Sequence, residues 1–310
     1  MEQYRTVSSR ADGLELDVLE VIPEGEVRGI VQFVHGMQEH KERYLHFMRY
    51  LADHGYACLI HDHRGHGKSV RQPEDLGYFY DKEGKAIVED VFDVVQDLIL
   101  RYPHAPVYMV GHSMGSLIVR SYLKKHDDQL DKLIISGAVF NNPSAKAGLN
   151  LIKCLSAVKG EHGHSKLVDG MVCGAFDKKI PGDQKNRWLS HNEKNNEAFN
   201  NHELDGKPFT LNGYRNLMLL IQDTYSTEGW DVENPSLPVL FLAGEEDPVI
   251  GGPQEFEKTV QALRDKGYEN VHSKLYPDMR HEILNEINKE VVYQDILNYL
   301  DDGTLPKGAH

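Results

Sequence analysis

The stretch VYMVGHSMGSLIVRSYL, residues 107–123, decides the fold. It begins as a short apolar run, passes through Gly111-His112-Ser113-Met114-Gly115 and continues as a helical pattern. This pentapeptide matches G-x-S-x-G, and its strand–turn–helix context predicts a nucleophile elbow that exposes Ser113 above a sheet. Gly111 and Gly115 fit, because so tight a turn requires small residues beside the serine.

Short apolar runs alternate with helical patterns on both sides of this stretch. The runs predict strands at residues 29–34, 56–60, 107–110, 133–135, 239–242 and 271–276. Their nearly continuous apolar character is typical of parallel strands covered on both faces. An antiparallel hairpin is expected near 4–8 and 14–21, at the sheet edge. Helical stripes are expected at Ile87, Val88, Val91, Val95 and Leu98, and at Ile287, Val291, Leu297 and Leu300.

The alternation stops between residues 141 and 233, where no strand pattern occurs. Apolar patches at 149–158 and 217–221 indicate helices there. We therefore expect an α/β core from residues 1–140 and 234–310, interrupted by a helical cap at 141–233. The last segment, 303–310, is expected to be frayed.

A serine nucleophile requires a base and a group that orients the base. In the order Ser, acid, His, the acid follows the run 239–242, where Asp247 precedes a proline. Glu245 and Glu246 are close rivals, and Asp278 is a weaker one. His281 is the downstream histidine expected in a loop beyond a strand end. We therefore predict catalytic roles for Ser113, His281 and Asp247.

An oxyanion hole requires two backbone N–H groups. One is expected from Met114, directly after the nucleophile, and the other from Met37, after the run 29–34. His35 and Gly36 precede Met37, and Gly36 lets the backbone approach the substrate closely.

Five ordered segments resemble those of monoacylglycerol lipases and related lysophospholipases, in the serine aminopeptidase-like superfamily of α/β-hydrolases. They are HGMQEH with RY following (35–44), DHRGHGKS (62–69), GHSMG (111–115), GEEDP (244–248) and HEILNE (281–286). The resemblance implies an α/β-hydrolase fold, a mostly parallel central sheet flanked by helices, with a helical cap insertion. Gln38 and Ser116 depart from the pattern, since glycine is usual at both positions.

The same resemblance implies a serine carboxylic ester hydrolase that acts on esters such as monoacylglycerols. Lysophospholipid hydrolysis, peptide or thioester cleavage and acyl transfer stay open as alternatives, as does, more remotely, a non-catalytic ligand-binding role on the same fold. Transient contact of the cap with lipid is also expected.

The composition and charge of the chain exclude further classes of function. The chain has 310 residues and a net charge of −14, which argues against nucleic-acid binding. The run His61-x-His63-x-x-His66 has a metal-ligand spacing, but Gly65 stands where such sites use an acid. We predict no metal, no cofactor, no stable membrane insertion and a cytoplasmic location; the sequence does not indicate the oligomeric state.

Overall fold

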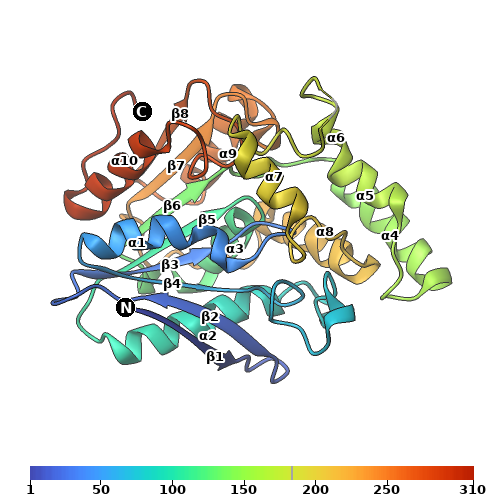
Figure 1. Ribbon diagram of the computed structural model, residues 1–310, viewed down its shortest axis with the longest axis horizontal. Helices are drawn as coiled ribbons and strands as arrows, with labels where there is room; N and C mark the ends of the chain where they lie inside the picture. The colour runs from blue at the N-terminus through green and yellow to red at the C-terminus, as the bar shows by residue number, and fades with distance from the viewer. Residues whose placement is uncertain (183) are drawn as a thin grey trace.

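Eight strands form one sheet in the computed structural model, which describes residues 1–182 and 184–310 (Figure 1). The spatial order is β1-β2-β4-β3-β5-β6-β7-β8; β2 is antiparallel to β1 and β4, and the remaining pairs are parallel. The strands are β1 (Glu2–Ser8), β2 (Glu15–Val21), β3 (Gly29–Val34), β4 (Tyr56–His61), β5 (Val107–His112), β6 (Lys132–Ser136), β7 (Val239–Gly244) and β8 (Val271–Tyr276). The predicted fold is confirmed, including the edge hairpin.

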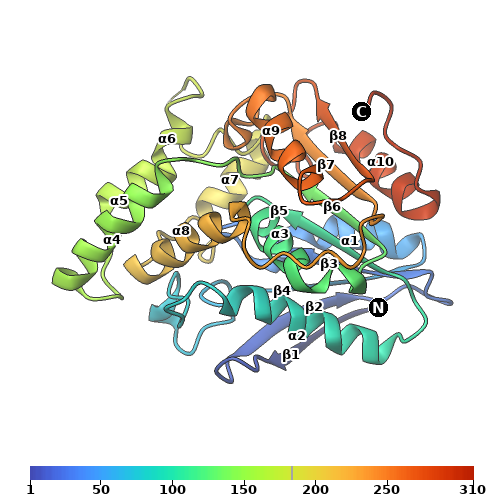
Figure 2. The same cartoon turned by 180° about the vertical axis from the view of Figure 1, so that it is seen from behind.

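Helices cover both faces of this sheet. Helices α1 (Leu45–Asp53) and α10 (Lys289–Asp302) lie on the face seen in Figure 1. Helices α2 (Ala86–Arg101), α3 (Met114–His126) and α9 (Pro253–Arg264) lie on the face seen in Figure 2. Strands β3, β4, β5 and β7 are buried along their whole length, which explains their continuous apolar sequences.

The strand order reverses beside β3. The chain passes from β3 to β4 on one side and then returns to β5 on the other side of β3. At such a switch point, the loops beyond the carboxyl ends of the two strands diverge and leave a crevice in which ligands bind. The loops that begin at His35 and Ser113 border this crevice, which positions both segments that the sequence singles out.

Only helices occur between β6 and β7 in the described residues. They are α4 (Ala145–Lys159), α5 (Lys166–Val172), α6 (Gly174–Asp177), α7 (Glu193–Asn201) and α8 (Leu211–Tyr225). Helix α8 packs against both α3 and α4 and thus joins the insertion to the core. Figure 1 shows α4, α5 and α6 in a row beyond one end of the sheet. The division at residues 141 and 233 stays a prediction.

One expectation about the C-terminal region is wrong, and a second holds only in part. The segment 303–310 is not frayed, because His310 exchanges two backbone hydrogen bonds with Ser273 of β8, at 2.9 and 3.1 Å. The stripe on the last helix is also shifted. Ile287 precedes α10 and is 65% exposed, and Val291 is 47% exposed. Leu297 and Leu300 are buried as predicted, and Val292, Tyr293 and Ile296 face the core with them.

No helix among residues 1–182 and 184–310 combines the length and the apolar character needed to cross a bilayer.

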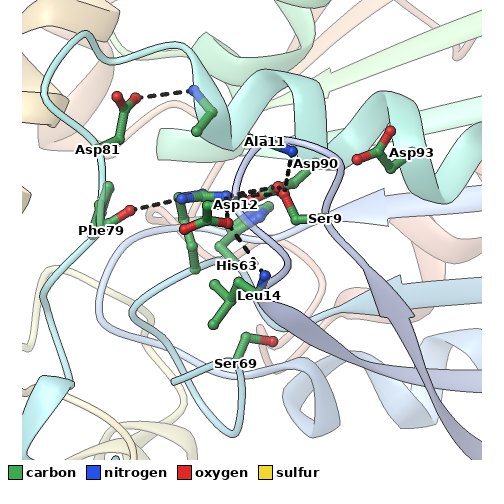
Figure 3. Close-up of polar contacts among 12 residues, drawn as sticks. Ser9, Ala11, Asp12, Leu14, His63, Ser69, Phe79, Asp81, Asp90 and Asp93 are labelled. Carbon is green, nitrogen blue, oxygen red and sulfur yellow. Dashed lines mark hydrogen bonds and ion pairs between the residues drawn. The ribbon is translucent and has the colours of Figure 1, made fainter. Parts of the chain in front are cut away.

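A buried arginine connects the loop after β4 to the first hairpin and to α2. Arg64 binds the carboxylate of Asp90 through Nε at 2.6 Å and Nη2 at 2.9 Å. It also donates to the Phe79 carbonyl at 3.0 Å and to Ser9 Oγ at 3.2 Å. Figure 3 shows Ser9, Asp12 and Asp90 gathered around this point. Because Asp90 is fully buried, its charge depends on this partner.

We expect Arg64→Met to lower the free energy of unfolding by about 3–5 kcal/mol, because it leaves a buried carboxylate without its cation. Urea denaturation measures the change. Arg71→Met is the matched control, since Arg71 is half exposed and its ion pair with Asp12 lies at the surface. That variant should lose less than about 1 kcal/mol. Equal losses in both variants would contradict the argument.

Candidate active site

The predicted nucleophile Ser113 occupies the turn between β5 and α3. Its backbone has φ 55° and ψ −117°, a strained conformation for a residue other than glycine. The Ser113 N–H donates to the carbonyl of Ser136 at 3.0 Å, and the Ser116 N–H donates to the carbonyl of Ser113 at 2.8 Å. The surrounding structure thus holds the strained turn in place.

Two glycines make this turn sterically feasible. A Cβ atom on Gly115 would lie 2.0 Å from the carbonyl oxygen of Val34, and one on Gly111 would lie 2.7 Å from the methyl groups of Val119. Neither neighbour can retreat, because both belong to the packed sheet and helix. The pattern G-x-S-x-G therefore has a local steric cause here.

His281 and Asp247 lie together beyond the ends of β8 and β7. His281 Nδ1 and Asp247 Oδ2 are 2.8 Å apart, and the other carboxylate oxygen accepts the Val249 N–H at 2.8 Å. His281 Nε2 is buried and has no hydrogen-bond partner among the described residues. Ser113 and His281 border the same small cavity, so Nε2 is the atom available to the serine hydroxyl.

The charges around His281 favour its protonated form. Burial alone would lower the pKa of His281, but Asp247 raises it by charge and hydrogen bonding, with smaller contributions from Glu282 and Glu39, and the result is a raised pKa. The neighbouring His112 has its pKa held well below the usual value by burial and by the charges of His281 and Arg43. His112 therefore stays neutral, and the proton-carrying ring is His281.

The loop after β3 passes directly against the nucleophile. A Cβ atom on Gly36 would lie 2.7 Å from Glu39 Oε1 and 3.1 Å from Ser113 Cβ, so a larger residue here would displace one or both. The N–H groups of Met37 and Met114 donate no hydrogen bond within the part of the chain that the structure describes. Both residues border the cavity at Ser113, and Met114 is the first residue of α3, where the helix dipole favours negative charge.

A buried ionic network supports this loop. Glu39 accepts the Gly36 N–H at 2.5 Å and the Tyr44 hydroxyl at 2.9 Å. Arg43 bridges Glu39, at 3.1 Å, and both oxygens of Glu282, at 2.6 and 2.7 Å. Burial, opposed by Arg43 and assisted by Glu282, raises the pKa of Glu39 to about 7. The network connects the loop after β3 to the residue that follows His281.

His35 supports the loop from its other side. Its Nδ1 lies 2.8 Å from the Gly36 carbonyl, and its Nε2 accepts the His63 N–H at 3.0 Å. The rings of His61 and His66 pack in the same buried cluster. Burial lowers the pKa of His61 to about 3 and that of His66 to about 4, which keeps both neutral. These rings act as polar packing beneath the loop.

The residues with a metal-compatible arrangement are elsewhere, in His40, His202 and Asp205. They connect the oxyanion loop to the insertion. His40 Nδ1 lies 2.7 Å from Asp205 Oδ1, and the rings of His40 and His202 stack 4.1 Å apart. Arg43 also lies 3.7 Å from Asp205 Oδ2. The carboxylate therefore already has hydrogen-bonding and cationic partners, and the group acts as a contact between the loop and the insertion.

Three residues at the site have no role assigned from the sequence. Gly137, with φ +56°, lies so close to His281 that a Cβ atom would be 2.9 Å from the ring. The Trp188 ring packs 5.1 Å from that of His281 and comes from the insertion. Arg43 was included in a matching segment without a role. Of the three, only Arg43 is marked by the sequence, because it follows His35-Gly36 at the spacing of the matching segment.

Residues 25–288 match the family described as serine aminopeptidase, S33. A monoacylglycerol lipase of Mycolicibacterium smegmatis is 24% identical over 284 residues, which is 90% of each chain. A monoglyceride lipase of Mus musculus is 24% identical over 92% of this chain and 89% of its own. A thermostable carboxyl esterase from Bacillus coagulans superposes with a TM-score of 0.84, at 26% identity over 97% of this chain and 98% of its own.

Fold and site together define an α/β-hydrolase with a serine elbow. The family match spans most of the chain, and the protein therefore belongs to the serine aminopeptidase (S33) family. The match identifies the chain as a serine hydrolase, and the relatives compared above are lipases and an esterase.

We expect kcat/KM to fall as the pH drops through the pKa of His281, because only the neutral ring accepts the serine proton. Since this pKa is raised above 6.5, the midpoint of the acid limb should lie above that value. Asp247→Asn should shift the midpoint to lower pH and reduce kcat by about 10²–10⁴-fold. A pH–rate profile with a soluble chromogenic ester measures both.

Glu246→Gln is the matched control. Glu246 is exposed and pairs with His191 at 2.9 Å rather than with His281. Its variant should keep the wild-type profile. If Glu246→Gln shifts the profile and Asp247→Asn does not, the assignment of the acid is wrong.

Proposed function

We propose that the protein hydrolyses carboxylic esters of the monoacylglycerol type through an acyl-enzyme on Ser113. The observation that carries this proposal is an apolar cavity of about 230 Å³ that reaches Ser113, Met37 and Met114. An acyl chain in this cavity would have its carbonyl carbon at the serine and its carbonyl oxygen near the two proposed oxyanion donors.

Helices α4, α5 and α8 of the insertion supply ten of the 22 residues that line the cavity. The apolar side chains include Leu151, Ile152, Val168, Val172, Leu217 and Met218. Burial of one methylene group contributes about 0.8 kcal/mol, so a cavity of this kind rewards an extended hydrocarbon chain. A peptide substrate would bring backbone polar groups that this wall does not satisfy.

The proposed reaction begins with proton transfer from Ser113 Oγ to His281 Nε2 as the oxygen attacks the ester carbonyl. The N–H groups of Met37 and Met114 stabilise the tetrahedral oxyanion. The carbonyl then re-forms, the bond to the alcohol oxygen breaks, and His281 gives its proton to the departing alcohol. Asp247 keeps the ring oriented and stabilises its charge.

Water completes the cycle. It loses a proton to His281 as it attacks the acyl carbon, a second oxyanion forms at the same N–H groups, and the fatty acid leaves as Ser113 regains its proton. The balance is one ester and one water converted into one acid and one alcohol. This chemistry uses groups that the chain itself provides.

The decisive experiment compares monoacylglycerols of graded acyl length, with release of fatty acid as the readout. Wild-type protein should prefer chains long enough to fill the cavity, and Ser113→Ala should abolish turnover while the thermal melting curve is retained. Leu151→Trp should move the preference to shorter acyl chains, because the larger ring occupies part of the cavity.

Lys153→Trp, on the exposed side of the same helix, controls for the introduction of the ring and should keep the wild-type preference. Turnover that survives in pure Ser113→Ala protein would refute the nucleophile. An identical rate for every acyl length would refute the acyl assignment of the cavity.

We also propose transient contact of the insertion with lipid, as the sequence leads us to expect. Val158 is 85% exposed on α4 and Leu167 is 59% exposed on α5. Both lie on the helices that wall the cavity, yet neither borders it. The predicted cytoplasmic location stays a prediction.

The double variant Val158→Asp, Leu167→Asp should hydrolyse monoacylglycerol held in phosphatidylcholine vesicles several-fold more slowly than wild-type protein, because two apolar contacts with the lipid are lost. Its rate on a soluble short-chain ester should match that of wild-type protein. Equal rates on the vesicles, or an equal loss on both substrates, would contradict lipid contact at this surface.

A further inference from the structure

Two cavities meet at Ser113, and they differ in chemistry. The larger one is apolar and does not include His281 in its wall, whereas a smaller one of about 30 Å³ is bordered by both Ser113 and His281. The departing alcohol must receive its proton from His281. If the acyl chain occupies the larger cavity, the alcohol part of the ester belongs in the smaller one, which we call the alcohol chamber.

Two buried hydrogen-bond donors in the wall of the alcohol chamber lack a partner among the described residues. They are Nε2 of Gln38 and Nε1 of Trp188. Trp188 is only 8% exposed, and its ring also borders the larger cavity. An unpaired buried donor costs free energy in the empty site. An acceptor oxygen on the alcohol would remove that cost.

The backbone conformation of Gln38 independently indicates that this residue has a functional role. Its φ of +58° lies in the left-handed region, which glycine occupies without the steric cost that a glutamine bears. The Gln38 carbonyl accepts the Gly206 N–H at 2.8 Å, and Cys173 Sγ lies 3.8 Å from the side-chain Oε1. These contacts orient the amide with Nε2 unpaired. Strain at a residue beside the nucleophile is characteristic of a functional position.

The charges in the wall exclude one class of alcohol. No lysine or arginine borders the alcohol chamber in the described part of the chain, while Glu39 and Glu282 do. A phosphate-bearing head group would find no lysine or arginine in this wall and would face the carboxylates of Glu39 and Glu282. A neutral alcohol with free hydroxyl groups needs no basic partner and is not repelled by the carboxylates.

We propose that Gln38 and Trp188 form a polar subsite that binds a free hydroxyl group on the alcohol part of the ester. This inference rests on the proposed ester hydrolysis and deepens it. The hydroxyl oxygen accepts hydrogen bonds from the amide and the indole, which positions the ester for attack. The subsite selects short neutral polyols, such as the glycerol of a monoacylglycerol, over simple alkyl alcohols and over the phosphate-bearing head group of a lysophospholipid.

Two esters of one fatty acid test the subsite, the 2-hydroxyethyl ester and the propyl ester. Their alcohol parts have the same number of heavy atoms and differ by one hydroxyl group. Wild-type kcat/KM should favour the hydroxyethyl ester by about five- to tenfold, the effect of one net hydrogen bond. Gln38→Gly and Trp188→Phe should each bring this ratio toward one, since each removes a donor.

Thermal melting separates this role from a structural one. Gln38→Gly should melt at or above the wild-type temperature, because glycine relieves the strain at positive φ, yet it should lose selectivity. Trp230→Phe is the control for the ring change, because the Trp230 N–H already donates to Ser226 at 2.9 Å. That variant should keep the wild-type ratio.

The results separate failure of the subsite from failure of the proposed ester hydrolysis. If the wild-type protein hydrolyses neither ester, the proposed function fails together with the subsite. If both esters are hydrolysed with equal kcat/KM, or if the ratio survives in both Gln38→Gly and Trp188→Phe, the subsite is refuted and ester hydrolysis stands. A preference for lysophosphatidylcholine over monoacylglycerol of the same acyl chain would refute the neutral-alcohol assignment.

Discussion

The close crossing of α3 over the end of β3 is the constraint on which the site depends. At Gly115 the helix backbone lies so near the Val34 carbonyl that no Cβ atom fits between them. This crossing has two consequences. It forces the sharp turn that carries Ser113 in its strained conformation, and it brings the loop after β3 against the serine. The nucleophile and the proposed oxyanion donors are therefore positioned by one backbone contact rather than by separate arrangements.

Buried ion pairs and hydrogen bonds connect the loop beside this turn to His281, the proposed base. Glu39 holds the Gly36 N–H, Arg43 joins Glu39 to Glu282, and Glu282 directly follows His281. A single buried guanidinium thus ties the oxyanion loop to the histidine loop. Because both carboxylates depend on it, loss of Arg43 would leave two buried acids competing for charge. Even with Arg43 present, burial and the charge of Glu282 raise the pKa of Glu39 to about 7.

The sequence predicted those features whose cause is local or ordered along the chain. The elbow at Ser113 follows from steric limits within five residues. The acid and the base are predicted from their place after strands and from the order Ser, acid, His along the chain. Gly137 escaped prediction because its tight contact is with His281, more than a hundred residues away in the chain. Trp188 escaped because it lies in a turn between α6 and α7, where no periodicity shows which aromatic ring reaches the histidine. The paired tail at His310 escaped because polar, glycine-containing ends are frayed unless a distant strand accepts them.

Gln38 shows how a departure from a pattern gains meaning in three dimensions. In the sequence, a glutamine stands where glycine is usual in the family that the chain resembles, and the sequence does not show what its side chain does. In the structure the positive φ explains why glycine suits the position, so the glutamine is a cost to folding. Costs of this kind persist where the side chain contributes something else. Gln38 and Trp188 both border the alcohol chamber, and Gln38 Nε2 and Trp188 Nε1 are buried without a hydrogen-bond partner among the described residues. One residue from the oxyanion loop and one from the insertion then select the alcohol, and the same insertion selects the acyl chain, so both halves of the ester are recognised where the insertion meets the core.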